Sequence, residues 1–430
     1  MTNISRRHFL AIAGTGLAST ALGFPAISFG AGKNVVIVGG GIAGSTCAKY
    51  IRAMDGSVNV TLIEPKKTYV TCFMSNEVIS GERDIKTTHF GYAGLRKHGI
   101  EVLHDMVISI DPVAKKIGTK DGIKLNYDAC VVAPGIDFRW DAIEGYDAKV
   151  AETLPHAWQA GEQTLLLRNQ IQAMRDGGTV IIVAPQNPFR CPPGPYERAS
   201  QIAWYLKNNK PKSKIIILDP KPKFSKMPLF VAGWQRHYGY KSSNSLIEWV
   251  GGPDGGEVTR VDPKNMSAIA TSSFKGDVIN VIPPQIAGKI AHVADLVDED
   301  NGYCPVNHAS FESSRHKDIY VIGDATIAAP MPKSGYAANS QAKVCAAAVV
   351  AKLNGKSAPV PSFVNTCYSL ITPNDGVSVA MVYRLGAKGK IEKVKGAGGV
   401  TPKDASDAMR KREATYAYSW FKNITHDIFS

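Results

Sequence analysis

The stretch VVIVGGGIAG, residues 35–44, decides the fold of this chain. Its four leading apolar residues are typical of a buried parallel strand, and the residues after the glycines continue as a helix. Gly39, Gly41 and Gly44 stand in the GxGxxG register, which permits a tight turn, a close approach of backbone to a pyrophosphate, and close packing of strand and helix. The free N–H groups at the start of that helix would face the phosphates. We therefore expect a dinucleotide cradle here, which includes Ala43.

An acidic residue stands about 20 residues beyond these glycines, as dinucleotide-binding folds require. Glu64 follows the strand-like run VNVTLI and precedes Pro65, and its carboxylate is placed to accept the hydroxyls of an adenosine ribose. A glycine-rich turn in an unrelated sheet is the alternative. The strand, the spacing and the acid together favour the cradle.

Two later segments identify the dinucleotide. The segment KLNYDACVVAPG, residues 124–135, is a strand that ends in Ala133, Pro134 and Gly135, and DIYVIGDA, residues 318–325, is a strand that ends in Gly323 and Asp324. These have the form of the second and third flavoprotein signatures, so FAD is favoured over NAD. The segment MPKSGY, residues 331–336, opens a helix whose N-terminus we expect to face the flavin, through Lys333, Ser334 and Gly335.

The chain between the second and third signatures reads as an inserted domain. The strand-like GGTVIIVAP, residues 177–185, would end in a second glycine fingerprint in an NADH-using enzyme. Here five prolines and one glycine stand between Ala184 and Ala199. Because proline has no N–H to donate, a phosphate cradle is not expected. We predict a Rossmann-like domain without nicotinamide binding, whose loop presents Arg190, Cys191 and Glu197.

Composition excludes some functions. The 430 residues allow two or three domains, and the net charge is +13. Lysines gather between Lys207 and Lys226, but Phe224 is the aromatic residue among them, too few for a single-strand nucleic-acid groove. No nucleic-acid binding is expected. The lysines form either a solvated face or a surface for an acidic partner or an anionic substrate.

The N-terminus predicts export. Arg6 and Arg7 precede a mild apolar stretch, residues 9–24, which is typical of a twin-arginine signal over residues 1–30. An uncleaved anchor is the alternative, but the stretch is short and weakly apolar for a membrane span. We expect a periplasmic protein without stable membrane insertion.

The seven cysteines do not follow one pattern. Cys72 lies eight residues beyond Glu64 but has no CxxxxC partner, since the next cysteine is Cys130; a buried free thiol is its plainest interpretation. Cys47, Cys130 and Cys345 are expected in the core, and Cys304 has no assigned role. There is no CxxCH for haem attachment and no metal-ligand spacing among the histidines.

Five segments carry a family resemblance: YVTCFMSNEV, CPPGPYERAS, MPKSGYAANSQ, NTCYSL and YAYSWFKNITHD. They resemble the flavoprotein subunit of flavocytochrome c sulfide dehydrogenase, over essentially the whole chain, and more distantly the sulfide:quinone reductases. The resemblance implies FAD bound covalently through an 8α-S-cysteinyl bond to Cys72, with Asn76 also at the cofactor. It further implies a redox-active disulfide between Cys191 and Cys367, with Glu197 as an acid/base beside it; a purely structural carboxylate is the alternative for Glu197.

The expected architecture is an α/β fold of the glutathione-reductase type, with two dinucleotide-binding domains and a small C-terminal α+β domain. We predict an FAD domain over residues 31–145 and 275–357, a degenerate NAD-like domain over 146–274, and an interface domain over 358–430. The tail carries Tyr416, Tyr418, Trp420 and Phe421, which belong either to the core or to a cytochrome-docking surface. Polar residues interrupt these aromatics, so no amphipathic membrane helix of the kind found in quinone reductase tails is expected there.

The predicted function is a periplasmic sulfide:cytochrome c oxidoreductase, which oxidises hydrogen sulfide and passes electrons to a separate c-type cytochrome subunit. Two alternatives stay open: a flavin-bearing accessory subunit of a thiosulfate-oxidising complex, and a sulfide:quinone reductase.

Overall fold

The computed structural model describes residues 32–430, so the predicted signal segment lies outside the described residues. The first unit is built on a five-stranded parallel sheet in the order β19-β9-β1-β2-β5. Its strands are β1 Asn34–Val38, β2 Asn59–Ile63, β5 Ile100–Leu103, β9 Ala129–Val132 and β19 Ile319–Val321. Strands from early and late in the chain thus form one sheet, whose central strands are buried on both faces, as parallel sheets require.

The glycine turn of the first unit has the geometry that the sequence predicts. Gly39 has φ +100°, which favours glycine, and its N–H donates to the Ile63 carbonyl at 2.9 Å. A Cβ on Gly44 would lie 1.9 Å from the Gly39 carbonyl oxygen, so helix α2 (Ile42–Met54) approaches β1 as closely as it does only because residue 44 is glycine. Helix α9 (Gly335–Leu353) packs beside α2.

The second unit has a four-stranded parallel sheet in the order β13-β12-β11-β17. Its strands are β11 Thr179–Val183, β12 Lys214–Leu218, β13 Ile247–Val250 and β17 Val278–Val281, and its helices are α5 Glu162–Ala173, α6 Gly194–Asn209 and α7 Met227–Tyr238. The predicted boundary after residue 274 needs correction, because β17 pairs with β11 and the chain leaves this sheet only after Val281.

Smaller elements connect and decorate the two sheets. Strands β10 and β18 form an antiparallel ribbon on the two crossings between the units. The remaining strands are β3 Thr68–Val70, β4 His89–Gly91, β6 Val107–Asp111, β7 Lys116–Thr119, β8 Lys124–Asn126, β10 Ile136–Phe138, β14 Arg260–Asp262, β15 Ser267–Ile269, β16 Ser273–Lys275 and β18 Gln285–Ala287. The short helices are α3 Ser75–Ser80, α4 Ala93–Lys97 and α8 Lys289–Val293, of which α3 reaches α5 and α6 of the second unit.

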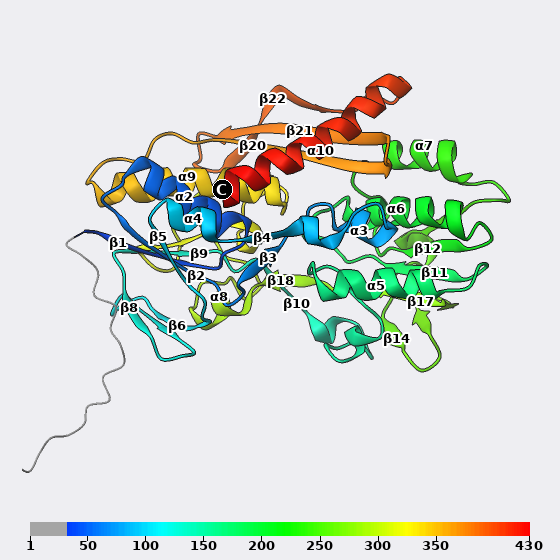
Figure 1. Cartoon of the computed structure of the whole chain (residues 1–430), viewed down its shortest axis with the longest axis horizontal. Coiled ribbons are helices and arrows are strands. Elements are labelled where there is room, and N and C mark those ends of the chain that lie inside the picture. Colours follow the sequence, from blue (N-terminus) through cyan, green and yellow to red (C-terminus); the bar gives the residue numbers. More distant parts are fainter. Residues whose placement is uncertain (1–31) are drawn as a thin grey trace, which may run out of the picture.

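The C-terminal segment forms an antiparallel sheet, β20 Ser362–Thr372, β21 Asp375–Leu385 and β22 Ile391–Val400, and a long helix, α10 Asp407–Phe429. Figure 1 shows this sheet and α10 along the upper side of the molecule, above both units, and β20 contacts α9 and α6. The tail thus contains a long helix that its sequence order does not suggest, and the apolar face of this helix packs against the protein. Ala414, Ala417, Phe421, Ile424 and Ile428 recur at intervals of three and four and are buried on one face.

Lys422 and Asn423, which interrupt the aromatics of the tail, are exposed on the outer face of α10, whereas Asp427 faces the first unit and accepts hydrogen bonds from Tyr50 and Asn339. Within residues 32–430, no helix is both long and apolar enough to cross a membrane. The expected core positions of Cys47, Cys130 and Cys345 are confirmed, and Cys304 is also buried, at a β-bridge to Thr326.

Candidate active site

A cavity of about 610 Å³ opens at the carboxyl ends of the strands of the first sheet. We call it the dinucleotide cleft. It is lined by eleven of the residues predicted for cofactor binding: Gly39, Gly41, Ala43, Glu64, Pro65, Cys72, Ala133, Pro134, Gly135, Gly323 and Asp324. Gly44 lies behind this wall and holds α2 against β1. The cleft is thus built by segments from positions 39 to 324 that only the fold brings together.

Glu64 is held rigidly at one end of this cleft. Its Oε2 accepts the Gly40 N–H at 2.8 Å and its Oε1 accepts the Lys66 N–H at 3.0 Å. Since each carboxylate oxygen has a further lone pair, the side chain can still accept the hydroxyls of a ribose.

Asp324 supplies the strongest indication of a ligand. Its Oδ1 is buried and has no hydrogen-bond partner in the protein, and burial raises the pKa of the carboxyl group. A buried polar atom without a partner costs about 1–3 kcal/mol, and because this one borders the cleft it is placed to accept a hydrogen bond from a bound molecule. Together with the glycine cradle and Glu64, Asp324 fits a dinucleotide with a hydroxylated chain, as FAD is.

A second, smaller cavity of about 120 Å³ adjoins the cleft, and we call it the cysteine pocket. Cys72, Cys191, Cys367 and Glu197 all line it. Cys72 and Arg190 line both cavities, so they stand at the boundary between the cleft and the pocket.

Three separate elements place these side chains. Cys191 has left-handed φ (+58°), its N–H donates to the Lys333 carbonyl at 2.8 Å, and Glu197 lies in the first turn of α6. Cys367 lies on β20 opposite Val379. Both cysteines are thiols in this structure, and their pairing as a disulfide stays a prediction.

Burial dominates the electrostatics of the pocket. It raises the pKa of the thiols of Cys72, Cys191 and Cys367, and the Lys226 ammonium opposes this increase at Cys367. Burial also raises the pKa of Glu197, although its Oε1 accepts the Leu370 N–H at 2.9 Å and its Oε2 accepts Asn76 Nδ2 at 3.1 Å. A carboxyl group with a raised pKa is suited to proton exchange near neutral pH.

The structure places some predicted cofactor residues elsewhere. Asn76, Ser334 and Gly335 line the cysteine pocket rather than the cleft. Lys333 lines neither; its Nζ donates to the carbonyls of Asp324 and Thr326, both at 2.8 Å, and lies 3.5 Å from the centre of the Tyr303 ring. Burial lowers the pKa of Lys333 to about 8.

Two residues of the pocket region have positions that the sequence does not predict. Lys226, counted within a basic surface segment, lies beside Cys367 with its Nζ 4.0 Å from the sulfur. Trp420 lines the pocket and stacks on Tyr336, with 6.0 Å between ring centres and 8° between ring planes. Neither has a local sequence signal, because each contact joins segments far apart in the chain.

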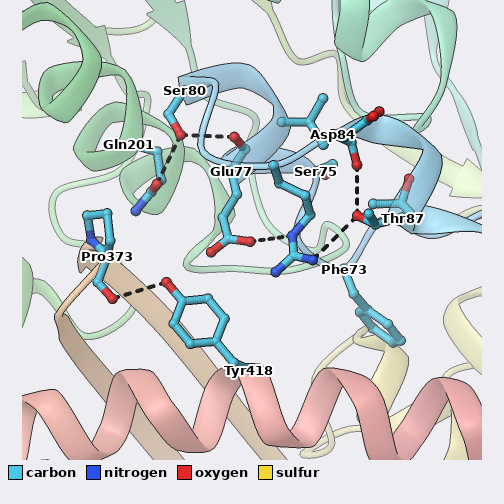
Figure 2. A network of polar contacts seen from close by, with 12 residues as sticks. Phe73, Ser75, Glu77, Ser80, Asp84, Thr87, Gln201, Pro373 and Tyr418 are labelled. Carbon is cyan, nitrogen blue, oxygen red and sulfur yellow. Dashed lines mark hydrogen bonds and ion pairs between the residues drawn. The ribbon is translucent and has the colours of Figure 1, made fainter.

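Polar contacts secure the wall that α3 contributes to the pocket (Figure 2). Glu77 is buried and its Oε2 lies 2.5 Å from Nε of Arg83, while Ser80 donates to Gln201 of α6 at 3.3 Å. On α10, the Tyr418 hydroxyl donates to the Pro373 carbonyl at 3.0 Å. These contacts hold α3 against α6 and α10 against the β20–β21 turn.

In the second unit, protein side chains occupy the position where a nucleotide ribose would bind. Asp219, directly after β12, occupies the place that Glu64 holds after β2, but its carboxylate is fully buried. It accepts the Tyr196 hydroxyl at 2.6 Å and Trp249 Nε1 at 3.0 Å, and it lies 2.6 Å from Lys221 Nζ. The Lys221 N–H also donates to Asp219 Oδ1 at 3.1 Å, so each carboxylate oxygen has two donors and none is left to accept from a ribose. In addition, the proline-rich loop stands in place of the phosphate cradle. Within residues 32–430 no cluster of three or more His, Cys, Asp or Glu is arranged to hold a metal.

Comparison with known proteins gives three family matches. The family described as Sulfide dehydrogenase (flavocytochrome c) flavoprotein chain, central, matches residues 164–283, and Flavocytochrome c sulphide dehydrogenase, flavin-binding, matches residues 359–429. Pyridine nucleotide-disulphide oxidoreductase matches residues 33–172. The flavocytochrome c sulfide dehydrogenase flavoprotein chain of Chlorobaculum thiosulfatiphilum is 56% identical over 46 residues, which are 11% of this chain and 96% of that sequence.

The chain belongs to the flavocytochrome c sulfide dehydrogenase flavoprotein family. It is also similar to the mitochondrial sulfide:quinone oxidoreductase of Dictyostelium discoideum, 22% identical over 326 residues, 72% of this chain and 69% of the relative. The structure of the Aquifex aeolicus sulfide:quinone oxidoreductase has the same fold, with a TM-score of 0.69, 17% identity and 92% coverage of both chains. The predicted two-nucleotide-domain flavoprotein fold is confirmed, and the cofactor that the cleft fits is FAD.

Proposed function

We propose that this protein is the flavoprotein subunit of a periplasmic sulfide:cytochrome c oxidoreductase. Sulfide is oxidised at a disulfide between Cys191 and Cys367, and Cys72 would hold FAD covalently as the group that supplies the onward redox chemistry. The observation that carries this proposal is the convergence of these three cysteines and Glu197 on one small pocket beside the dinucleotide cleft.

The pocket suits attack by hydrosulfide on a disulfide. A thiolate or hydrosulfide attacks one sulfur and releases the other as a thiolate. The pocket, of about 120 Å³, has room for a nucleophile as small as hydrosulfide. Glu197, with its raised pKa, exchanges the proton of hydrogen sulfide at its carboxylate oxygens, which Leu370 and Asn76 hold in place. FAD, when bound, accepts electrons in a pair and releases them singly.

Cys72 is suited to hold the cofactor because it lies in the walls of both cavities. Arg190 also lines both cavities, and its Nη2 donates a hydrogen bond to the Trp158 carbonyl. A thioether from Cys72 would keep the cofactor in place after export, which the twin arginine Arg6 and Arg7 suggest.

A c-type cytochrome is the acceptor we favour, because the family models named for flavocytochrome c match both the central and the C-terminal segments. A quinone is the second candidate, because the chain shares its fold with a sulfide:quinone oxidoreductase over 92% of its length. One assay distinguishes the two acceptors, because the rates of cytochrome reduction and of quinone reduction can be compared directly.

The experiment supplies the purified holoprotein anaerobically with sulfide and either a soluble c-type cytochrome or a short-chain quinone. We expect sulfide-dependent reduction of the cytochrome at a rate well above that of the quinone. Faster turnover with the quinone would assign the protein to the second candidate, and no turnover with either acceptor while FAD remains oxidised would refute sulfide oxidation.

A further inference from the structure

One cation in the cysteine pocket region has no role in the function proposed so far. Nζ of Lys226 donates to Ser369 Oγ at 2.8 Å and to the Cys367 carbonyl at 3.2 Å, and it lies 4.0 Å from Cys367 Sγ. Ser369 is buried. The ammonium is therefore directed at β20 rather than at solvent, unlike the exposed Lys223 three residues before it.

The backbone holds this lysine in place at some cost. Lys226 has left-handed φ (+59°), which for a residue other than glycine is unfavourable by about 1–3 kcal/mol. Its carbonyl accepts the N–H groups of Leu229 and Phe230 at the start of α7, at 2.9 and 3.1 Å. Phe224, two residues earlier, is stacked on Tyr196 with 3.7 Å between ring centres. Anchors on both sides thus fix the side chain beside Cys367.

The two sulfurs of the pocket differ in the charges around them. At Cys367, burial is opposed first by Lys226 and by a hydrogen bond from Ser369, while Glu197 acts against the thiolate. At Cys191, burial is reinforced by Cys367, Glu197 and Cys72, and Lys226 acts only weakly. The guanidiniums of Arg190 and Arg198 also interact with Cys191, but the pKa of this thiol still lies well above its usual value. A negative charge is therefore better stabilised on Cys367 than on Cys191.

Helix α6, which begins just after Cys191, does not reverse this difference. A helix N-terminus usually stabilises an anion through its free N–H groups. Here the Gly194 N–H donates to the Cys191 carbonyl, those of Tyr196 and Glu197 donate to the Pro193 carbonyl, and Pro195 has none. The first turn thus directs no free N–H at the Cys191 sulfur.

We propose that Lys226 is a positioning residue that makes Cys367 the leaving sulfur, so that hydrosulfide attacks Cys191. The proposal rests on the proposed function, since it requires the Cys191–Cys367 disulfide. A bond forms between the hydrosulfide sulfur and Cys191 Sγ, and the Sγ–Sγ bond breaks with its electron pair left on Cys367. The products are a persulfide on Cys191, which keeps the proton of hydrosulfide, and a Cys367 thiolate beside the Lys226 ammonium. The sulfide sulfur is oxidised and Cys367 is reduced, so the step balances. A sulfur whose thiolate is better stabilised leaves faster. Because the Lys226 ammonium stabilises the Cys367 thiolate, Cys367 is the leaving sulfur.

The test compares the holoproteins of the wild type, Lys226→Met, Lys226→Arg and the exposed control Lys223→Met. In each protein, reduced by dithiothreitol, iodoacetamide alkylation of Cys191 and Cys367 is followed against pH by peptide mass spectrometry. We expect the wild-type Cys367 thiol to titrate below Cys191, and Lys226→Met to raise its pKa by about 1–3 units. Lys226→Arg should retain the wild-type order, and Lys223→Met should change nothing. Methionine has the same backbone constraint as lysine, and a melting curve checks that the variant is folded.

A second measurement locates the persulfide after one equivalent of sulfide is added anaerobically and the protein is rapidly alkylated. We expect the additional sulfur on Cys191 in the wild type, and flavin reduction by sulfide slowed on the order of 10-fold in Lys226→Met. A persulfide on Cys367, or a thiol titration that Lys226→Met leaves unchanged, would overturn the assignment while sulfide oxidation stood. If sulfide gave neither persulfide nor reduced flavin in the wild type, the proposed function would fail, and the alkylation data would still show whether Lys226 stabilises the Cys367 thiolate.

Discussion

Replacement of Glu197 by glutamine separates the chemical role of this carboxyl group from its structural role. In the wild type, Oε1 accepts the Leu370 N–H and Oε2 accepts Asn76 Nδ2. A glutamine amide can satisfy only one of these donors, and Asn76 cannot turn its own oxygen to the amide, because Arg198 Nε donates to that oxygen at 3.2 Å. Two donors then face each other, which should cost about 1–3 kcal/mol of unfolding free energy.

The pH dependence of this cost has a definite sign. Burial raises the folded-state pKa of Glu197 above its usual 4.5, so the stability that this group contributes is complete below pH 4.5 and is lost as the pH rises through the folded-state pKa. Glutamine does not titrate. The deficit of Glu197→Gln should therefore be largest near pH 4.5 and shrink at pH 8 by about 1.4 kcal/mol for each unit of pKa elevation.

The assays are urea unfolding at several pH values and anaerobic stopped-flow reduction of the flavin by sulfide. We expect the variant to reduce its flavin roughly 100-fold more slowly, as removal of a general acid/base does, and to lose the limb of the pH–rate profile that belongs to this group. Glu162→Gln is the control, because Glu162 lies in the first turn of α5, as Glu197 lies in the first turn of α6, but its carboxylate is exposed. A stability deficit independent of pH would refute the raised pKa, and an unchanged pH–rate profile would remove Glu197 from the chemistry.

Three further predictions concern the cofactor, the second unit and the C-terminal domain. Cys72→Ser should bind FAD that denaturant releases, whereas wild-type FAD should stay on the polypeptide in a denaturing gel; release from the wild type would rule out the thioether. NADH should not bleach the flavin in anaerobic stopped flow, because Asp219 is engaged by Tyr196 and Trp249, and rapid bleaching would contradict this. Asp375→Asn should lower the unfolding free energy by about 2–3 kcal/mol at pH 7, because Arg236 and His237 contact that carboxylate, each at 2.8 Å. Burial opposes ionisation of Asp375, but those hydrogen bonds hold its pKa below 3.8. The stability that the carboxylate provides should therefore be lost only as the pH falls below about 4. Unfolding measured against pH checks this, and a wild-type protein that had already lost this stability at pH 6 would contradict it.

Sequence reasoning succeeded where a local pattern encodes a local geometry. The turn at Gly39, the approach of α2 at Gly44 and the unpartnered carboxylate of Asp324 lie in the cleft region as the spacing predicts. It failed where the decisive contact joins distant segments. Lys226 reaches Cys367 across 141 positions, and a run of lysines looks the same whether its last member faces water or a thiol.

The C-terminal helix was missed for a different reason. The aromatic and small residues of α10 lie on one face only when wound at 3.6 residues per turn, and their linear order suggests interruption by polar residues. Trp420 is therefore a residue of the cysteine pocket, whereas the sequence predicts either a core or a docking role for the aromatics of the tail. The predicted boundary of the second unit is wrong because the sequence of β17 is like that of any short buried strand. Only its pairing with β11 shows that β17 belongs to the second sheet.

Anaerobic sulfide titration of Cys191→Ser and Cys367→Ser decides whether Cys191 and Cys367 form a catalytic or a structural disulfide. A structural disulfide closing a loop of this length would contribute roughly 5 kcal/mol to stability. We predict that both variants keep their flavin, melt within a few degrees of the wild type and show no flavin reduction by sulfide. Normal flavin reduction with a strongly lowered melting temperature would instead show that the disulfide is structural.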